Sequence, residues 1–153
     1  MELRTQLDYL RAEHQEMSTM AMDLTAAFSL AQGKDVRTRS SGIARVRSHE
    51  NELPGVIEHC HWVHRLLESP FRAYLEDEEV TALNEDHGRL ERLVSDFQRE
   101  LEFASVDRTS DVIAFGNSLI EALHAHISLE ERILKRVEET YEPSGETLAR
   151  YIQ

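Results

Sequence analysis

Histidine interrupts four separate amphipathic stretches of this 153-residue chain. The four positions are His14, His64, His87 and His126. Two of them are followed four residues later by a glutamate, in His64-x-x-x-Glu68 and His126-x-x-x-Glu130. In a helix, positions i and i+4 lie on one face, so each pair would present an imidazole beside a carboxylate. Imidazole and carboxylate together are typical ligands of first-row transition metals.

The two glutamates give the stronger indication of a metal. A single histidine in an apolar stripe is most often an ordinary core residue. A carboxylate there is different, because burying an unpaired charge costs several kcal/mol. No Lys or Arg lies on the same stripes near Glu68 or Glu130. Four His and two Glu exceed the needs of one tetrahedral ion, so we expect two octahedral ions bridged by the carboxylates.

Apolar residues at spacings of three and four predict the elements that must position these side chains. Four long helices are expected over residues 2–31, 54–76, 78–104 and 109–141, with a tail over 144–153. Short connections favour an all-α, antiparallel, up-down-up-down four-helix bundle in a single domain, residues 1–153. Counting residues to the helix ends places His64, His87 and His126 at a common depth in that bundle.

The one long connection, residues 33–53, is basic. It is expected to be a solvated loop or short helix facing the acidic body of the protein, and we assign it no function. Its basic residues are Lys34, Arg37, Arg39, Arg45 and Arg47.

Composition excludes several classes of function. The formal net charge of -12 disfavours nucleic acid and anionic membrane surfaces as partners. A single cysteine, Cys60, allows neither an intrachain disulfide nor a thiolate cluster. The N-terminus shows no signal-peptide pattern, and no stretch approaches a membrane span. We therefore expect a cytoplasmic protein.

The order His, His-x-x-x-Glu, His, His-x-x-x-Glu resembles the hemerythrin-like, or HHE cation-binding, domain family. The local settings that carry this resemblance are Arg11-Ala-Glu-His14-Gln-Glu-Met17, Glu85-Asp-His87-Gly-Arg-Leu90 and Ala125-His126-Ile-Ser-Leu-Glu130. The resemblance implies a four-helix bundle holding two non-haem iron ions that bind dioxygen or a related small molecule such as NO or peroxide. It also implies terminal ligands and bridges: His14, His64, His87 and His126 as the former, Glu68 and Glu130 as the latter.

The chain departs from that family in two places. Oxygen-carrying members have a second histidine on the third helix, where this chain has Leu83 and Glu91. His61 is a candidate for the additional ligand, and Glu91 is another. Pro70 also follows Glu68 closely, and proline interrupts a regular helix. The sequence shows no dedicated acid, base or substrate pocket, so we expect a binding protein for sensing, storage or detoxification more than a dedicated enzyme.

Other residues were weighed against this interpretation. His59 lies about 200° around the helix from His61, so both cannot face inward, and His59 is expected at the surface along with His124. Cys60 is expected to be a small apolar residue. A ferritin-like di-iron carboxylate protein is a rival because Glu-x-x-His occurs twice, in Glu58-His-Cys-His61 and Glu121-Ala-Leu-His124. A metal-free helical interaction module is the second rival.

Overall fold

The computed structural model describes residues 3–152, with side chains at all of these positions except 70 and 141–152. This part of the chain is helical and contains no β-strand, apart from an isolated bridge between Ser105 and Arg108. The helices are α1 (Leu3–Ala31), α2 (Val36–Ser48), α3 (Leu53–Leu66), α4 (Asp77–Phe103) and α5 (Ser110–Ile152). Two short 3₁₀ segments, Glu50–Glu52 and Pro70–Tyr74, precede and follow α3.

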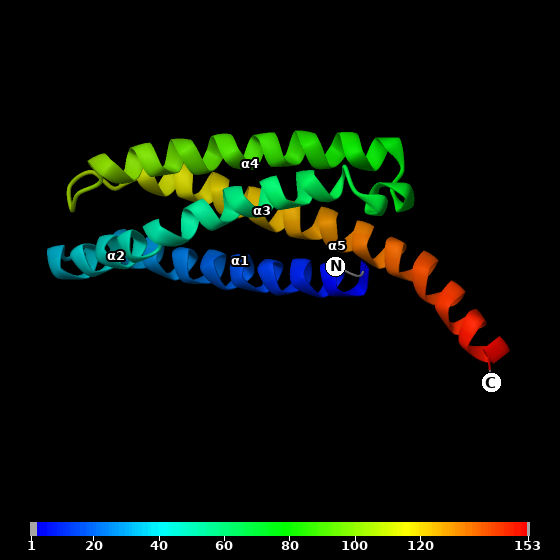
Figure 1. Ribbon diagram of the computed structural model, residues 1–153. Coiled ribbons are helices and arrows are strands. Elements are labelled where there is room, and N and C mark those ends of the chain that lie inside the picture. The colour runs from blue at the N-terminus through cyan, green and yellow to red at the C-terminus, as the bar shows by residue number, and fades with distance from the viewer. Residues whose placement is uncertain (1–2, 153) are drawn as a thin grey trace.

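The long helices α1, α3, α4 and α5 lie lengthwise beside one another and alternate in direction along the chain (Figure 1). This arrangement is consistent with the expected four-helix bundle. The last part of α5 extends past the end of the other helices (Figure 1). The expected helix end near residue 141 therefore does not occur, because α5 continues to Ile152.

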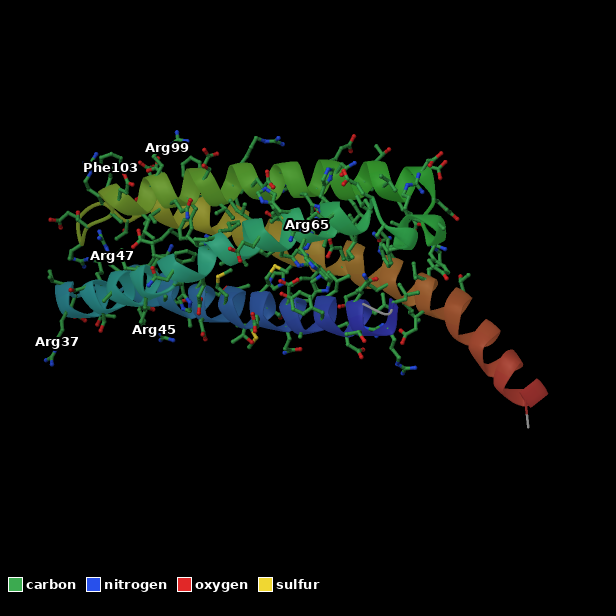
Figure 2. The ribbon with its side chains drawn as sticks, viewed as in Figure 1. Arg37, Arg45, Arg47, Arg65, Arg99 and Phe103 are labelled. Atoms are coloured by element: carbon green, nitrogen blue, oxygen red, sulfur yellow. The ribbon has the colours of Figure 1, made fainter. Side chains whose placement is uncertain are left out.

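The basic connection forms helix α2, which folds back along α1 (Figure 1). Asp35 begins it by accepting a hydrogen bond from the Thr38 backbone N–H at 2.8 Å, so one of the free amides of the first turn is satisfied. Arg47 donates to the Ala104 carbonyl oxygen and so ties α2 to the end of α4. Arg37 and Arg45 are exposed and point away from the body of the protein (Figure 2).

Close approach of α2 to α1 depends on Gly42. A Cβ atom at this position would lie 2.3 Å from the Ala31 backbone nitrogen and 2.8 Å from the Ala27 carbonyl oxygen. These are backbone atoms that cannot move aside cheaply. Gly42 thus lets the two helix backbones meet, and the buried side chains Ile43 and Val46 fill the remaining contact.

Helix α3 is shorter than the sequence pattern predicts, since it ends at Leu66 and not near residue 76. Proline has no backbone N–H, so Pro70 cannot donate to the Leu66 carbonyl as a continuing helix requires. The Leu66 carbonyl instead accepts from the Ser69 backbone N–H at 3.0 Å and from Ser69 Oγ at 2.6 Å. The chain then turns through the Pro70–Tyr74 segment into α4.

The apolar core is divided into two clusters along the bundle. One contains Met17, Leu24, Leu90 and Leu123, and the other contains Leu7, Leu10, Val63, Leu83 and Val137, each with further residues. On α1, α4 and α5 a buried histidine lies between the residues of the two clusters, and on α3 His59 lies within one turn of the change, which falls between Cys60 and Val63. A polar layer therefore crosses the core between the two apolar clusters.

Contrary to the expectation that no stretch approaches a membrane span, the segment Ser110–Thr140 of α5 is long and apolar enough by composition to cross a membrane. Its apolar residues include Leu119 and Leu123, which are fully buried against the other helices, and the same stretch buries His126 and Glu130. Length and apolar composition are therefore weak evidence for a membrane span, because the core helix of a protein passes the same test.

Replacing Gly42 by alanine should destabilise the fold by about 1–3 kcal/mol, because the added methyl group overpacks the α1–α2 contact. Gly88→Ala is the matched control, since a Cβ there meets only the Arg92 side chain at 3.6 Å. Urea unfolding of both variants measures the difference. Equal stability of the two variants would show that α2 does not pack on α1 through Gly42.

Candidate metal centre

The carboxylate of Glu130 lies at the centre of the polar layer, with its side chain only 4 % exposed. Its Oε1 lies 2.7 Å from His14 Nε2 and 2.9 Å from His59 Nε2. Its Oε2 lies 2.7 Å from His87 Nε2. His126 Nε2, one helical turn earlier on α5, lies 3.4 Å from Oε1. Four imidazole nitrogens therefore converge on one carboxylate.

These five residues come from all four long helices. His14 belongs to α1, His59 to α3, His87 to α4, and the pair His126 and Glu130 to α5. They are also all of the buried polar or charged residues among the side chains that the structure describes. The interior is thus apolar everywhere in that part of the chain except at this one layer.

Three of the imidazoles are held from outside by further carboxylates. In each, Nδ1 contacts an acidic side chain, which fixes the ring so that Nε2 points inward. The three pairs are His14 with Glu131 at 2.7 Å, His59 with Glu13 at 2.9 Å, and His126 with Asp86 at 2.6 Å. A carboxylate accepting from one ring nitrogen while the other faces inward is the usual environment of metal-ligating histidine.

This arrangement concentrates lone pairs at the centre. Because the outer carboxylates accept hydrogen bonds, Nδ1 of His59 and His126 carries a proton, and in a neutral ring Nε2 then carries a lone pair. These two Nε2 atoms face each other at 3.0 Å. Ligand atoms of His14, His59, His126 and Glu130 lie within 4.8 Å of one another. Only additional protons or a metal cation can relieve the repulsion among these atoms.

The pKa values of the metal-free cluster reflect this demand for positive charge. Burial opposes protonation of His126, but hydrogen bonds with Asp86 and Glu130 outweigh it and raise its pKa to about 9. Burial likewise opposes protonation of His59, and hydrogen bonds with Glu13 and Glu130 raise its pKa. For Glu130, burial favours the neutral acid, yet the four surrounding histidines hold its pKa well below the usual value.

Four of the residues expected from the sequence meet in this cluster: His14, His87, His126 and Glu130. His59, expected at the surface, is 1 % exposed and takes the place on α3 that the sequence pattern gave to His64. The expectation for His59 was therefore wrong.

The structure does not bring the other expected residues into the cluster. His64 and Glu68 are exposed, so the expectation that this pair faces the bundle axis is incorrect. His61 is also exposed and forms a surface pair with Glu91, in which Nε2 lies 3.3 Å from the carboxylate.

The error on α3 is one of helical phase. The buried face of α3 runs through Leu53, Val56, His59 with Cys60, Val63 and Leu66. The depth of His64 in the bundle was predicted from a helix end near residue 75. The helix in fact ends at Leu66, ahead of Pro70, so that prediction used the wrong end. The apolar residues Leu53, Val56, Cys60 and Val63 at spacings of three and four were the signal that places His59 inward.

The structure does not support the ferritin-like alternative, because the ligands that it requires do not face the interior. Glu58, His61, Glu121 and His124 are all exposed. Cys60 is buried, and burial raises the pKa of its thiol, which agrees with the expected role as a small apolar residue. Neither Glu-x-x-His pair reaches the polar layer.

Comparison of the chain with protein-family models, with curated proteins and with solved structures finds no match.

The metal-free protein should lose stability as the pH rises through about 9. The folded pKa of His126 is raised to about 9 from 6.5, so the stabilisation it provides is complete below pH 6.5 and disappears above the folded value. His59 acts in the same direction. Urea unfolding of chelator-treated protein across this range measures the effect.

Asp86→Asn is the control for this pH dependence, because the amide keeps the shape of the side chain but removes the charge that faces His126 Nδ1. Its loss of stability with rising pH should be smaller than that of the wild-type protein. Unfolding midpoints that do not change with pH in the wild type would contradict the assigned protonation.

Proposed function

We propose that this protein binds a transition-metal ion among Glu130 and the four histidines that surround it. The observation that carries the proposal is the convergence of four Nε2 atoms on one buried carboxylate, with three of the rings held from outside by acidic side chains. Protons alone could neutralise such a layer, but well-packed apolar residues of similar volume are often at least as stable as a buried ionic cluster. A divalent ion would replace those protons, and ligand atoms of His14, His59, His126 and Glu130 lie close enough together to hold it.

The donor set favours iron or a neighbouring first-row metal. Four imidazoles and one carboxylate are borderline ligands, unlike the all-oxygen sites of magnesium and calcium or the thiolate-rich sites of structural zinc. Four of these donors, from His14, His59, His126 and Glu130, lie within 4.8 Å of one another and would leave two positions of an octahedral ion free. Iron is our proposed metal, in keeping with the resemblance of the sequence to the hemerythrin-like family.

The buried donors support one ion more directly than two. A carboxylate-bridged pair would use a second inward glutamate, and the expected one, Glu68, is exposed. The α3 position that corresponds to Glu130, four residues after the inward histidine, is Val63, which is buried and apolar. A second ion has one observation in its favour, since Asp86, His87 and His126 also offer grouped ligand atoms. That group shares His126 with the first.

We further propose that the bound metal takes up a small molecule such as dioxygen or NO, for sensing, storage or detoxification. Iron at this place would supply an open coordination position and an electron to such a molecule. The chain's own residues orient the rings through Glu13, Asp86 and Glu131. The apolar clusters on either side, with Leu10 and Leu90 adjacent to the layer, exclude water from it.

The experiment compares two histidines of the same helix. Protein purified anaerobically is loaded with Fe²⁺, and bound metal is measured by elemental analysis. His59→Ala should weaken binding by more than the roughly 10- to 100-fold loss that follows from removing an outer partner of a ligand. His64→Ala, which changes an exposed side chain five residues later on α3, should bind as the wild type does.

Visible absorption before and after exposure to oxygen or NO then tests the second step. New bands in the wild type and in His64→Ala, absent from His59→Ala, are the expected result. One metal per chain supports the mononuclear site, and two support the bridged pair. A folded, colourless wild-type protein that binds no metal would overturn the proposal and leave the metal-free interaction module.

A further inference from the structure

A small cavity reaches the polar layer from between α1 and α3. Its volume is about 60 Å³, and it is lined by Glu13, Glu16, Met17, Met20, Gly55 and His59. This is room for a few water-sized molecules or one partly hydrated ion. His59 is 1 % exposed and belongs to the cluster around Glu130, so this cavity ends against one residue of the candidate metal centre.

The cavity adjoins a larger cleft at the surface. That cleft has a volume of about 420 Å³ and shares Glu16 and Met20 with the inner cavity. Three acidic residues line the cleft: Glu16, Asp23 and Glu52. Neither Lys nor Arg is among the side chains that line these two spaces. A cation that approaches this face meets negative charge from the surface to Glu13, whose carboxylate contacts His59 Nδ1.

Gly55 keeps the passage open on the α3 side. A Cβ atom added at Gly55 would meet nothing within 4 Å, so the backbone has no packing reason to exclude a side chain here. This differs from Gly42, where a Cβ atom would collide with the backbone of α1. A glycine within a helix is less stable than alanine by roughly 1 kcal/mol, and no contact offsets that loss at this position.

The other side of the bundle differs from this face. A cleft of about 310 Å³ over α4 and α5 is lined by residues that include Glu79, Leu129 and Arg136, and by no member of the histidine cluster. There Arg136 is paired with Glu79, which neutralises the local charge.

We infer that the cleft along α1, together with the cavity between α1 and α3, forms the path by which the metal ion enters the centre. Glu16, Asp23 and Glu52 collect the cation, Gly55 leaves room for it beside α3, and Glu13 is the last carboxylate before His59. This inference rests on the proposed function, since it requires that the cluster binds a metal. It adds the direction of entry and the residues that set its rate.

The test measures the rate of metal uptake separately from the amount bound. Metal-free protein is mixed with Co²⁺ in a stopped-flow instrument, and the visible absorption of the bound ion is followed. Gly55→Phe should place a ring over the passage and slow both uptake and release to a chelator by an order of magnitude or more, with the equilibrium stoichiometry and affinity unchanged. Gly88→Phe is the matched control, an open helical glycine on α4 that is not among the residues lining either space, and should keep wild-type rates.

A second pair of substitutions tests the negative charge of the surface cleft without adding a larger side chain. Glu16→Gln combined with Asp23→Asn should slow uptake at low ionic strength and reduce its salt dependence, because electrostatic attraction of the cation is screened by salt. Leucine at position 55 gives an intermediate size if phenylalanine prevents folding.

Wild-type rates in Gly55→Phe, with full metal binding, would overturn the entry path and leave the metal site intact. A wild-type protein that binds no Co²⁺ and no Fe²⁺ would overturn the metal site and the path together.

Discussion

One buried carboxylate determines how the rest of the interior is built. Glu130 is held among four histidines, and none of these five residues is more than 6 % exposed. Leaving that charge without partners would cost several kcal/mol, so each long helix must supply a polar side chain at the same depth. The packing of α1, α3, α4 and α5 is therefore constrained by the requirement that His14, His59, His87 and His126 meet Glu130.

The outer carboxylates extend this constraint to the surface of the bundle. Glu13, Asp86 and Glu131 each fix the ring of one histidine. Each of these acids is also the direct sequence neighbour of a residue in the inner layer. Neighbouring positions on a helix point about 100° apart. A histidine can therefore face the centre while the acid next to it contacts a histidine of another helix. Glu13 precedes His14 but holds His59, and Asp86 precedes His87 but holds His126. The four helices are thereby cross-linked in pairs through polar contacts as well as through apolar packing.

The segment from α2 to the end of α3 is less regular than the other helices. It consists of α2 packed on the end of α1, a short 3₁₀ turn, and the 14-residue helix α3 that stops before Pro70. Of the three histidines on α3, His59 is buried in the polar layer, whereas His61 and His64 are exposed. The same segment contributes Gly55 and His59 to the small cavity between α1 and α3. This irregular segment therefore determines which histidine of α3 joins the cluster and where the cavity meets it.

The sequence alone determined the helices whose apolar repeat is long and unbroken. For α1, α4 and α5 the stripe is repeated over many turns, so His14, His87, His126 and Glu130 could be assigned to the interior from spacing. Only the tertiary structure decided the ligand from α3. That helix has about four turns, carries His59, His61 and His64 within six residues, and is ended by Pro70, so two helical phases were consistent with its pattern. Packing selected one of them, because Val56, Cys60 and Val63 bury apolar surface only when His59 faces Glu130, and in that phase His64 and Glu68 remain in solvent.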